Sequence, residues 1–87
     1  MSPQRVIITA AGSGIGREVA ARFAGAGGNI QVCDVDERAL GQLTSQHSNI
    51  TASTVDVSEE TGIDGWLQDA LDTLGGCDVL INNAGIA

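Results

Sequence analysis

Short apolar runs alternate with longer amphipathic stretches along the 87 residues of the chain. The runs are mostly rich in β-branched residues and predict four strands, at residues 5–10, 29–34, 49–56 and 78–83. Between them, apolar positions recur three or four residues apart, which predicts three helices. Strand and helix alternating at this spacing predict an α/β fold, in which right-handed crossovers build a parallel sheet flanked by helices.

Each predicted helix has a recognisable apolar face. The third has the clearest one, and Gly75-Gly76 follows it as a predicted helix end. Trp66 falls within this face, so we expect it to be a core residue. The faces of the three helices are formed by Ile15, Val19 and Phe23, by Ala39, Leu40 and Leu43, and by Ile63, Trp66, Leu67, Ala70, Leu71 and Leu74.

Length, charge and cysteine content narrow the class of protein. The chain can form one compact domain at most. Four arginines against eleven carboxylates give a net charge of −7, which disfavours nucleic acid and anionic membrane surfaces as partners. Neither a membrane span nor a secretory leader is recognisable, so we expect a cytoplasmic protein. Cys33 and Cys77 lack metal-ligand spacing, and we predict reduced packing residues and no metal site.

A run of small residues, T-A-A-G-S-G-I-G at 9–16, follows the first predicted strand. At a turn from strand into helix, backbone N–H groups and the helix dipole form an anion site, and a Cβ would keep a pyrophosphate away from the backbone. The run resembles the T-G-x-x-x-G-x-G motif of the short-chain dehydrogenase/reductase family. Thr9, Gly14 and Gly16 match, whereas Ala10 replaces the first glycine, and because alanine stands there we expect a negative φ.

A second motif, N-N-A-G at residues 82–85, is similar to another motif of this family in sequence and in its distance from the first. The resemblance implies that this segment borders the cofactor crevice and braces Thr9. It also implies a Rossmann-type sheet with strand order 3-2-1-4. It covers essentially the whole chain, but only the N-terminal part of a dinucleotide-binding domain, so we expect a truncated or partial family domain.

An acidic residue ends the second predicted strand and bears on the choice of cofactor. Asp34 lies eighteen residues after Gly16, where a carboxylate can accept hydrogen bonds from an adenosine ribose. It would repel a 2′-phosphate, and neither Ser13 nor Val35 supplies a basic side chain, so we predict NAD rather than NADP. The alternatives for Asp34 are a helix N-cap or a solvated strand end, although Asp36 is the better N-cap candidate.

A further acidic residue, Asp56, follows the third predicted strand. The resemblance implies that Asp56 meets the adenine amino group and that Val57 packs near the ring, whereas the alternative is that Asp56 caps the third helix. The complete set of predicted cofactor-binding residues is Thr9, Gly12, Ser13, Gly14, Ile15, Gly16, Asp34, Val35, Asp56, Val57, Asn82, Asn83, Ala84 and Gly85.

The family resemblance implies hydride transfer between NAD(H) and an alcohol or ketone, with a Ser and a Tyr-x-x-x-Lys pair as catalytic residues. The chain contains no tyrosine and no lysine, so we predict no catalytic residue within it and no activity for these 87 residues alone. We expect a homo-oligomeric parent enzyme. Two alternatives remain: a non-catalytic dinucleotide-binding mini-protein, and a methyltransferase-like Rossmann fragment, which Thr9 and the N-N-A-G motif disfavour.

Overall fold

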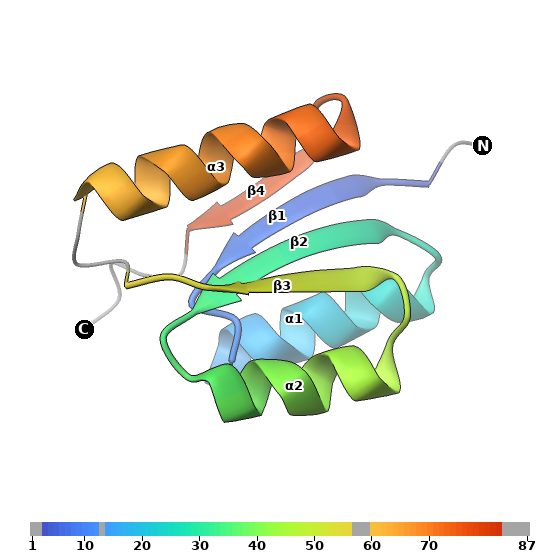
Figure 1. Ribbon diagram of the computed structural model, residues 1–87. Helices are drawn as coiled ribbons and strands as arrows, with labels where there is room; N and C mark the ends of the chain where they lie inside the picture. The colour runs from blue at the N-terminus through green and yellow to red at the C-terminus, as the bar shows by residue number, and fades with distance from the viewer. Residues whose placement is uncertain (1–2, 13, 57–59, 83–87) are drawn as a thin grey trace.

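The computed structural model describes residues 3–12, 14–56 and 60–82, and it has one parallel sheet between two layers of helices (Figure 1). The strand order is β3-β2-β1-β4, as predicted, and all three pairings are parallel. Strand β2 has the predicted bounds, β1 ends one residue earlier than predicted, β3 is three residues shorter, and β4 begins one residue later. The elements are β1 (Arg5–Thr9), α1 (Gly14–Gly25), β2 (Asn29–Asp34), α2 (Glu37–Gln46), β3 (Ile50–Thr54), α3 (Glu60–Leu74) and β4 (Val79–Asn82).

Helices cover both faces of the sheet, with α1 and α2 on one side and α3 on the other (Figure 1). Successive side chains of β1 alternate between the two layers because strand residues point to opposite faces. Val6 and Ile8 pack in the core under α1 and α2, whereas Ile7 packs with Trp66 of α3. All three β1 side chains are fully buried, as the two covered faces of a parallel sheet require.

Helix α1 buries a different face from the one predicted. Its buried residues are all small: Gly16, Ala20 and Ala24. Small side chains let the helix approach the sheet closely, so Val19 and Phe23 flank the core instead of forming its centre. Ile15 is 71% exposed, and the expectation that it belongs to a buried face is wrong.

The predicted faces of α2 and α3 are confirmed. Helix α2 buries Ala39, Leu40 and Leu43, and the carboxylate of Asp36 caps it by accepting from the Ala39 N–H at 3.0 Å. In α3, Trp66 is buried with Ala70, and the other apolar positions pack around them with partial burial. Gly75, with a φ of +74°, ends the helix.

The carboxyl ends of all four strands lie along one edge of the sheet, since the strands are parallel (Figure 1). The strand order reverses at β1, whose two neighbours are β2 and β4. Such a switch point is where open α/β sheets bind ligands. Thr9 at the end of β1 stands in register with Cys33 on one side and with Asn82 on the other.

Candidate functional site at the carboxyl ends of the strands

The loop after β1 is tied to the end of β2 through three successive backbone N–H groups. The Ala10 N–H donates to the thiol of Cys33. The next one, of Ala11, donates to the Cys33 carbonyl at 3.0 Å, and the Gly12 N–H donates to Oδ2 of Asp34 at 2.8 Å. These three donors therefore serve the protein itself, so the N–H groups expected to bind an anion are those from Gly14 onward.

Cys33 has a role in this loop that sequence reasoning missed. Its side chain is fully buried, and burial raises the pKa of the thiol against the opposing effect of the Ala10 N–H. The thiol is thus a neutral acceptor under the loop. Its only signal in the sequence is its place directly before Asp34. The prediction that Cys33 is a packing residue is confirmed by its full burial.

Asp34 is held at both carboxylate oxygens. Its Oδ2 accepts from Gly12, and its Oδ1 accepts from the backbone N–H of Asp36 at 3.0 Å. The side chain is half-buried at the end of β2. A carboxylate has about four acceptor positions, so both oxygens keep capacity for further donors such as ribose hydroxyls. The carboxylate is therefore oriented before any ligand arrives.

A side chain at position 12 would collide with this carboxylate. A Cβ built on Gly12 would lie 2.8 Å from Oδ2 of Asp34 and 2.9 Å from its Cγ. Both separations are shorter than van der Waals contact. A residue larger than glycine at position 12 would therefore displace the Asp34 carboxylate from its place in the site.

Ala10 has a positive φ of 56°, and the expectation of a negative value is wrong. The backbone there turns so that three consecutive N–H groups can reach β2. This left-handed conformation is the one that glycine adopts without cost. The family motif, which has glycine at this position, matches the observed backbone even though this chain has alanine.

Thr9 and Asn82 are brought together across the β1–β4 pair, as the family resemblance implied. The Thr9 hydroxyl donates to Oδ1 of Asn82 at 3.0 Å. Both residues line a cavity of about 200 Å³ on the α3 face of the sheet, together with Trp66, Leu67 and Leu80. The pair thus fixes the ends of the two strands that flank the switch point.

The first turn of α1 begins at Gly14, whose φ is +63°. The first N–H groups of any helix have no intrahelical acceptor, and this turn carries no acidic side chain. Ile15 lies there with 71% exposure, and Val35, directly after Asp34, is 59% exposed. Exposed apolar side chains beside polar donors and acceptors suit a ligand that has both rings and charged groups.

The other predicted site residues divide into two groups. Asp56 lies just beyond β3 with an exposed side chain, at the same edge of the sheet as Asp34. The remaining ones lie outside the described residues: Ser13, Val57, Asn83, Ala84 and Gly85. Among the predicted site residues, Thr9 with Asn82 and Gly12 with Asp34 form hydrogen bonds that join neighbouring segments at the site.

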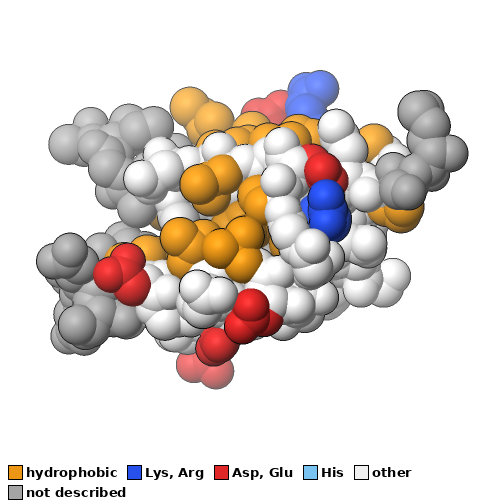
Figure 2. All heavy atoms as spheres, turned by 90° about the horizontal axis from the view of Figure 1, so that it is seen from above, with side chains coloured by type: hydrophobic (Ala, Val, Ile, Leu, Met, Phe, Trp, Pro, Cys, Tyr) orange, Lys and Arg blue, Asp and Glu red, His pale blue; other side chains and the backbone are white. Residues whose placement is uncertain are grey.

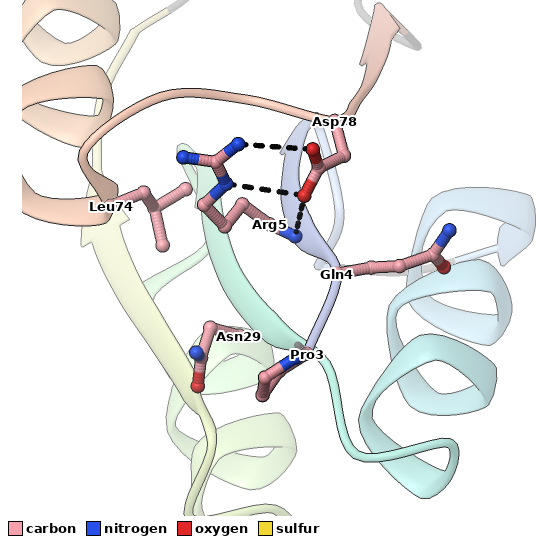
Figure 3. A pocket seen from close by; sticks show the side chains of 6 residues that line it. All are labelled: Pro3, Gln4, Arg5, Asn29, Leu74 and Asp78. Atoms are coloured by element: carbon pink, nitrogen blue, oxygen red, sulfur yellow. Dashed lines mark hydrogen bonds and ion pairs between the residues drawn. The ribbon is translucent and has the colours of Figure 1, made fainter. Parts of the chain in front are cut away.

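A cavity of about 630 Å³ lies at the opposite end of the sheet, at the amino ends of the strands (Figure 3). Arg5 and Asp78 line it and point toward one another. The guanidinium donates to both carboxylate oxygens, at 3.2 and 3.1 Å, and to the carbonyl of Gly75 at 2.9 Å. The two charges neutralise each other. This ion pair, called the clasp below, joins the start of β1 to the α3–β4 turn, so we assign a structural role to the amino-end cavity.

In the part of the chain that the structure describes, no three His, Cys, Asp or Glu side chains are grouped to hold a metal ion. None of the described helices is long and apolar enough to cross a membrane.

The chain belongs to the short-chain dehydrogenase family, because the family model for short chain dehydrogenases matches residues 4–87. A 1-deoxy-11-beta-hydroxypentalenate dehydrogenase from Streptomyces exfoliatus is 37% identical over 90 residues, which cover 99% of this chain and 33% of that protein. A 3beta-hydroxysteroid dehydrogenase 2 from Eggerthella lenta is 33% identical over 90 residues, with 99% and 35% covered. The chain thus spans about a third of the length of these relatives.

Solved structures of this family share the fold. A short-chain dehydrogenase from Streptomyces avermitilis superposes with a TM-score of 0.88 at 33% identity, over 97% of this chain and 31% of that one. A 3-ketoacyl-(acyl-carrier-protein) reductase from Brucella melitensis, solved in complex with NADH, gives 0.80 at 31% identity, over 88% and 32%. Membership of this family excludes the methyltransferase-like alternative.

Proposed function

We propose that residues 1–87 form the N-terminal, nucleotide-binding part of an NAD-dependent short-chain oxidoreductase. The observation that carries this proposal is the position of the Asp34 carboxylate. It lies beside the loop of residues 9–16, called the glycine loop below, and accepts the Gly12 N–H at 2.8 Å. A carboxylate in this position accepts hydrogen bonds from ribose hydroxyls and repels a 2′-phosphate. The Brucella melitensis reductase, solved with NADH, adds support from a relative with the same fold.

The residues present fit a dinucleotide along the edge of the sheet. The first turn of α1, with Gly14, Ile15 and Gly16, would hold the pyrophosphate through backbone N–H groups and the helix dipole. Asp34 would hold the adenosine ribose, and Asp56 with Val57 would contact the adenine. The segment from Asn82 to Gly85 would border the crevice on the other side of β1.

When bound, the nicotinamide would give or take a hydride at its C4 carbon, opposite an alcohol or carbonyl carbon of the substrate. The chain contains neither tyrosine nor lysine, so the Tyr-x-x-x-Lys pair of the family cannot lie within it. We propose that the catalytic residues, the pocket for an alcohol or ketone and the homo-oligomer contacts belong to the parent enzyme outside residues 1–87. This chain would supply cofactor binding alone.

Calorimetric titration of the protein at its natural length with NAD and with NADP tests the cofactor assignment. We expect NAD to bind at least about tenfold more tightly, a difference of about 1.4 kcal/mol, and Asp34→Ala to narrow that ratio. Asp36→Ala is the matched control, because it removes a neighbouring carboxylate that caps α2 and should leave the ratio unchanged. Equal affinities for the two cofactors in the unaltered protein would contradict the proposal.

A further inference from the structure

The glycine loop and the end of β2 are in steric contact at one point, Gly12 against Asp34. The resemblance to the family rests on Thr9, Gly14 and Gly16, and Gly12 occupies one of the variable positions of that motif. Its φ is not in the left-handed region, unlike that of Gly14. Backbone conformation therefore does not explain why a glycine stands at position 12.

The space around Gly12 does explain it. A Cβ there would meet three atoms of Asp34, namely Oδ2 at 2.8 Å, Cγ at 2.9 Å and Cβ at 3.2 Å. The same carboxylate accepts the Gly12 N–H at 2.8 Å and the Asp36 N–H at 3.0 Å, so it cannot rotate away without losing hydrogen bonds. The carboxylate and the loop backbone are packed against each other as one unit.

We propose that Gly12 is a specificity-determining residue, because its missing side chain lets the Asp34 carboxylate settle on the loop backbone in the orientation that receives a ribose. This inference rests on the proposed function and deepens it. Gly12 acts through Asp34 and is a positioning residue, since its own N–H already serves Asp34. An alanine at position 12 would push the carboxylate off the loop, which would weaken NAD binding and leave NADP binding little changed.

A double-mutant cycle on the protein at its natural length tests this coupling. The four proteins are the wild type, Gly12→Ala, Asp34→Ala and the double variant, each titrated with NAD and with NADP and each melted without cofactor. In the wild-type background, we expect Gly12→Ala to lower NAD affinity about tenfold and to narrow the NAD/NADP ratio. In the Asp34→Ala background, where Oδ2 and Cγ are gone, Gly12→Ala should lower NAD affinity by less than about twofold.

Gly41→Ala is the matched control, because a Cβ at this exposed α2 glycine meets nothing within 4 Å. It should leave both affinities unchanged. If Gly12→Ala does not fold, folding of the double variant supports the inference, and failure of both to fold overturns it.

If the effects of Gly12→Ala and Asp34→Ala on NAD affinity are additive and the wild type still prefers NAD, this inference is overturned. The proposed function is not affected by that result. In that case position 12 needs glycine for the ligand or the turn and not for Asp34. Equal NAD and NADP affinity in the wild type overturns the proposed function, and the inference falls with it. The wild-type titration therefore separates the two failures.

Discussion

Ala10 has a backbone conformation that alanine tolerates poorly. Its φ of 56° places Cβ against the following carbonyl, at a cost of about 1–2 kcal/mol. Glycine removes that contact but loses more chain entropy on folding. We expect the relief to exceed the entropy loss, so Ala10→Gly should raise the free energy of unfolding by about 1 kcal/mol. Urea denaturation of the wild type and the variant measures the difference.

The neighbouring alanine provides the control. Ala11 does not have a positive φ, is fully buried, and donates its N–H to Cys33. Ala11→Gly should therefore destabilise the protein, by about 1 kcal/mol or more. A loss of stability in both variants would show that the left-handed turn at Ala10 is not a source of strain.

These residue-level details mark where sequence reasoning stops. The strands and the strand order could be predicted, because β-branched runs and right-handed crossovers depend on local pattern. The torsion of Ala10 and the need for glycine at position 12 could not, since both are decided by Cys33 and Asp34, more than twenty positions away. The contact between Thr9 and Asn82 could be expected only through the family resemblance.

At the level of elements, the apolar pattern of a helix shows which residues can be buried but not which face comes closest to the sheet. In α1 the small residues around Ala20 take that place, and Ile15 is left exposed beside the site. In α3 the stripe is broad and marked by Trp66, so pattern and packing agree. Large side chains alone therefore do not identify the buried face, because those of α1 form the predicted stripe and yet flank the core or lie exposed.

The clasp between Arg5 and Asp78 joins β1 to the α3–β4 turn, 73 residues apart in sequence. The hydrogen bonds from Arg5 lower the pKa of Asp78 below its usual value. A carboxyl whose pKa is lowered on folding contributes stability above its unfolded pKa, about 3.9, and loses it as the pH falls through the folded value. Asp78→Asn should therefore lower the melting temperature at pH 7, and the difference should vanish in acid.

The pH dependence is measured as the difference in melting temperature between the wild type and Asp78→Asn. The other carboxylates are the same in both proteins, so their effects cancel in this difference. Glu18→Gln is the control for a general charge effect, since Glu18 pairs with Arg22 at 3.0 Å on the exposed surface of α1. Exposed pairs of this kind contribute little, and the melting temperature should hardly move. A difference for Asp78→Asn that persisted at low pH would mean that the charge of the clasp is not what stabilises it.

For the molecule as a whole, β4 is the edge of the described sheet on the side away from β2. Leu80 on this strand is 57% exposed, beside a cavity of about 200 Å³ that Ile63, Trp66 and Leu67 also line. Figure 2, seen from the α3 side, shows hydrophobic side chains open at the middle of this face. An edge strand with unpaired backbone groups and exposed apolar side chains is a template for pairing with another chain.

We therefore predict that the 87-residue polypeptide, prepared by itself, self-associates through β4 and its α3-side surface. Light scattering after size-exclusion chromatography at several concentrations should give a mass that rises above 8.8 kDa. Leu80→Lys should shift the equilibrium toward monomer, because it places a charge on the edge. Ile15→Lys, a matched change at an exposed site on α1, should not. A monomer at every concentration, with a cooperative thermal transition, would show that this edge is stable alone.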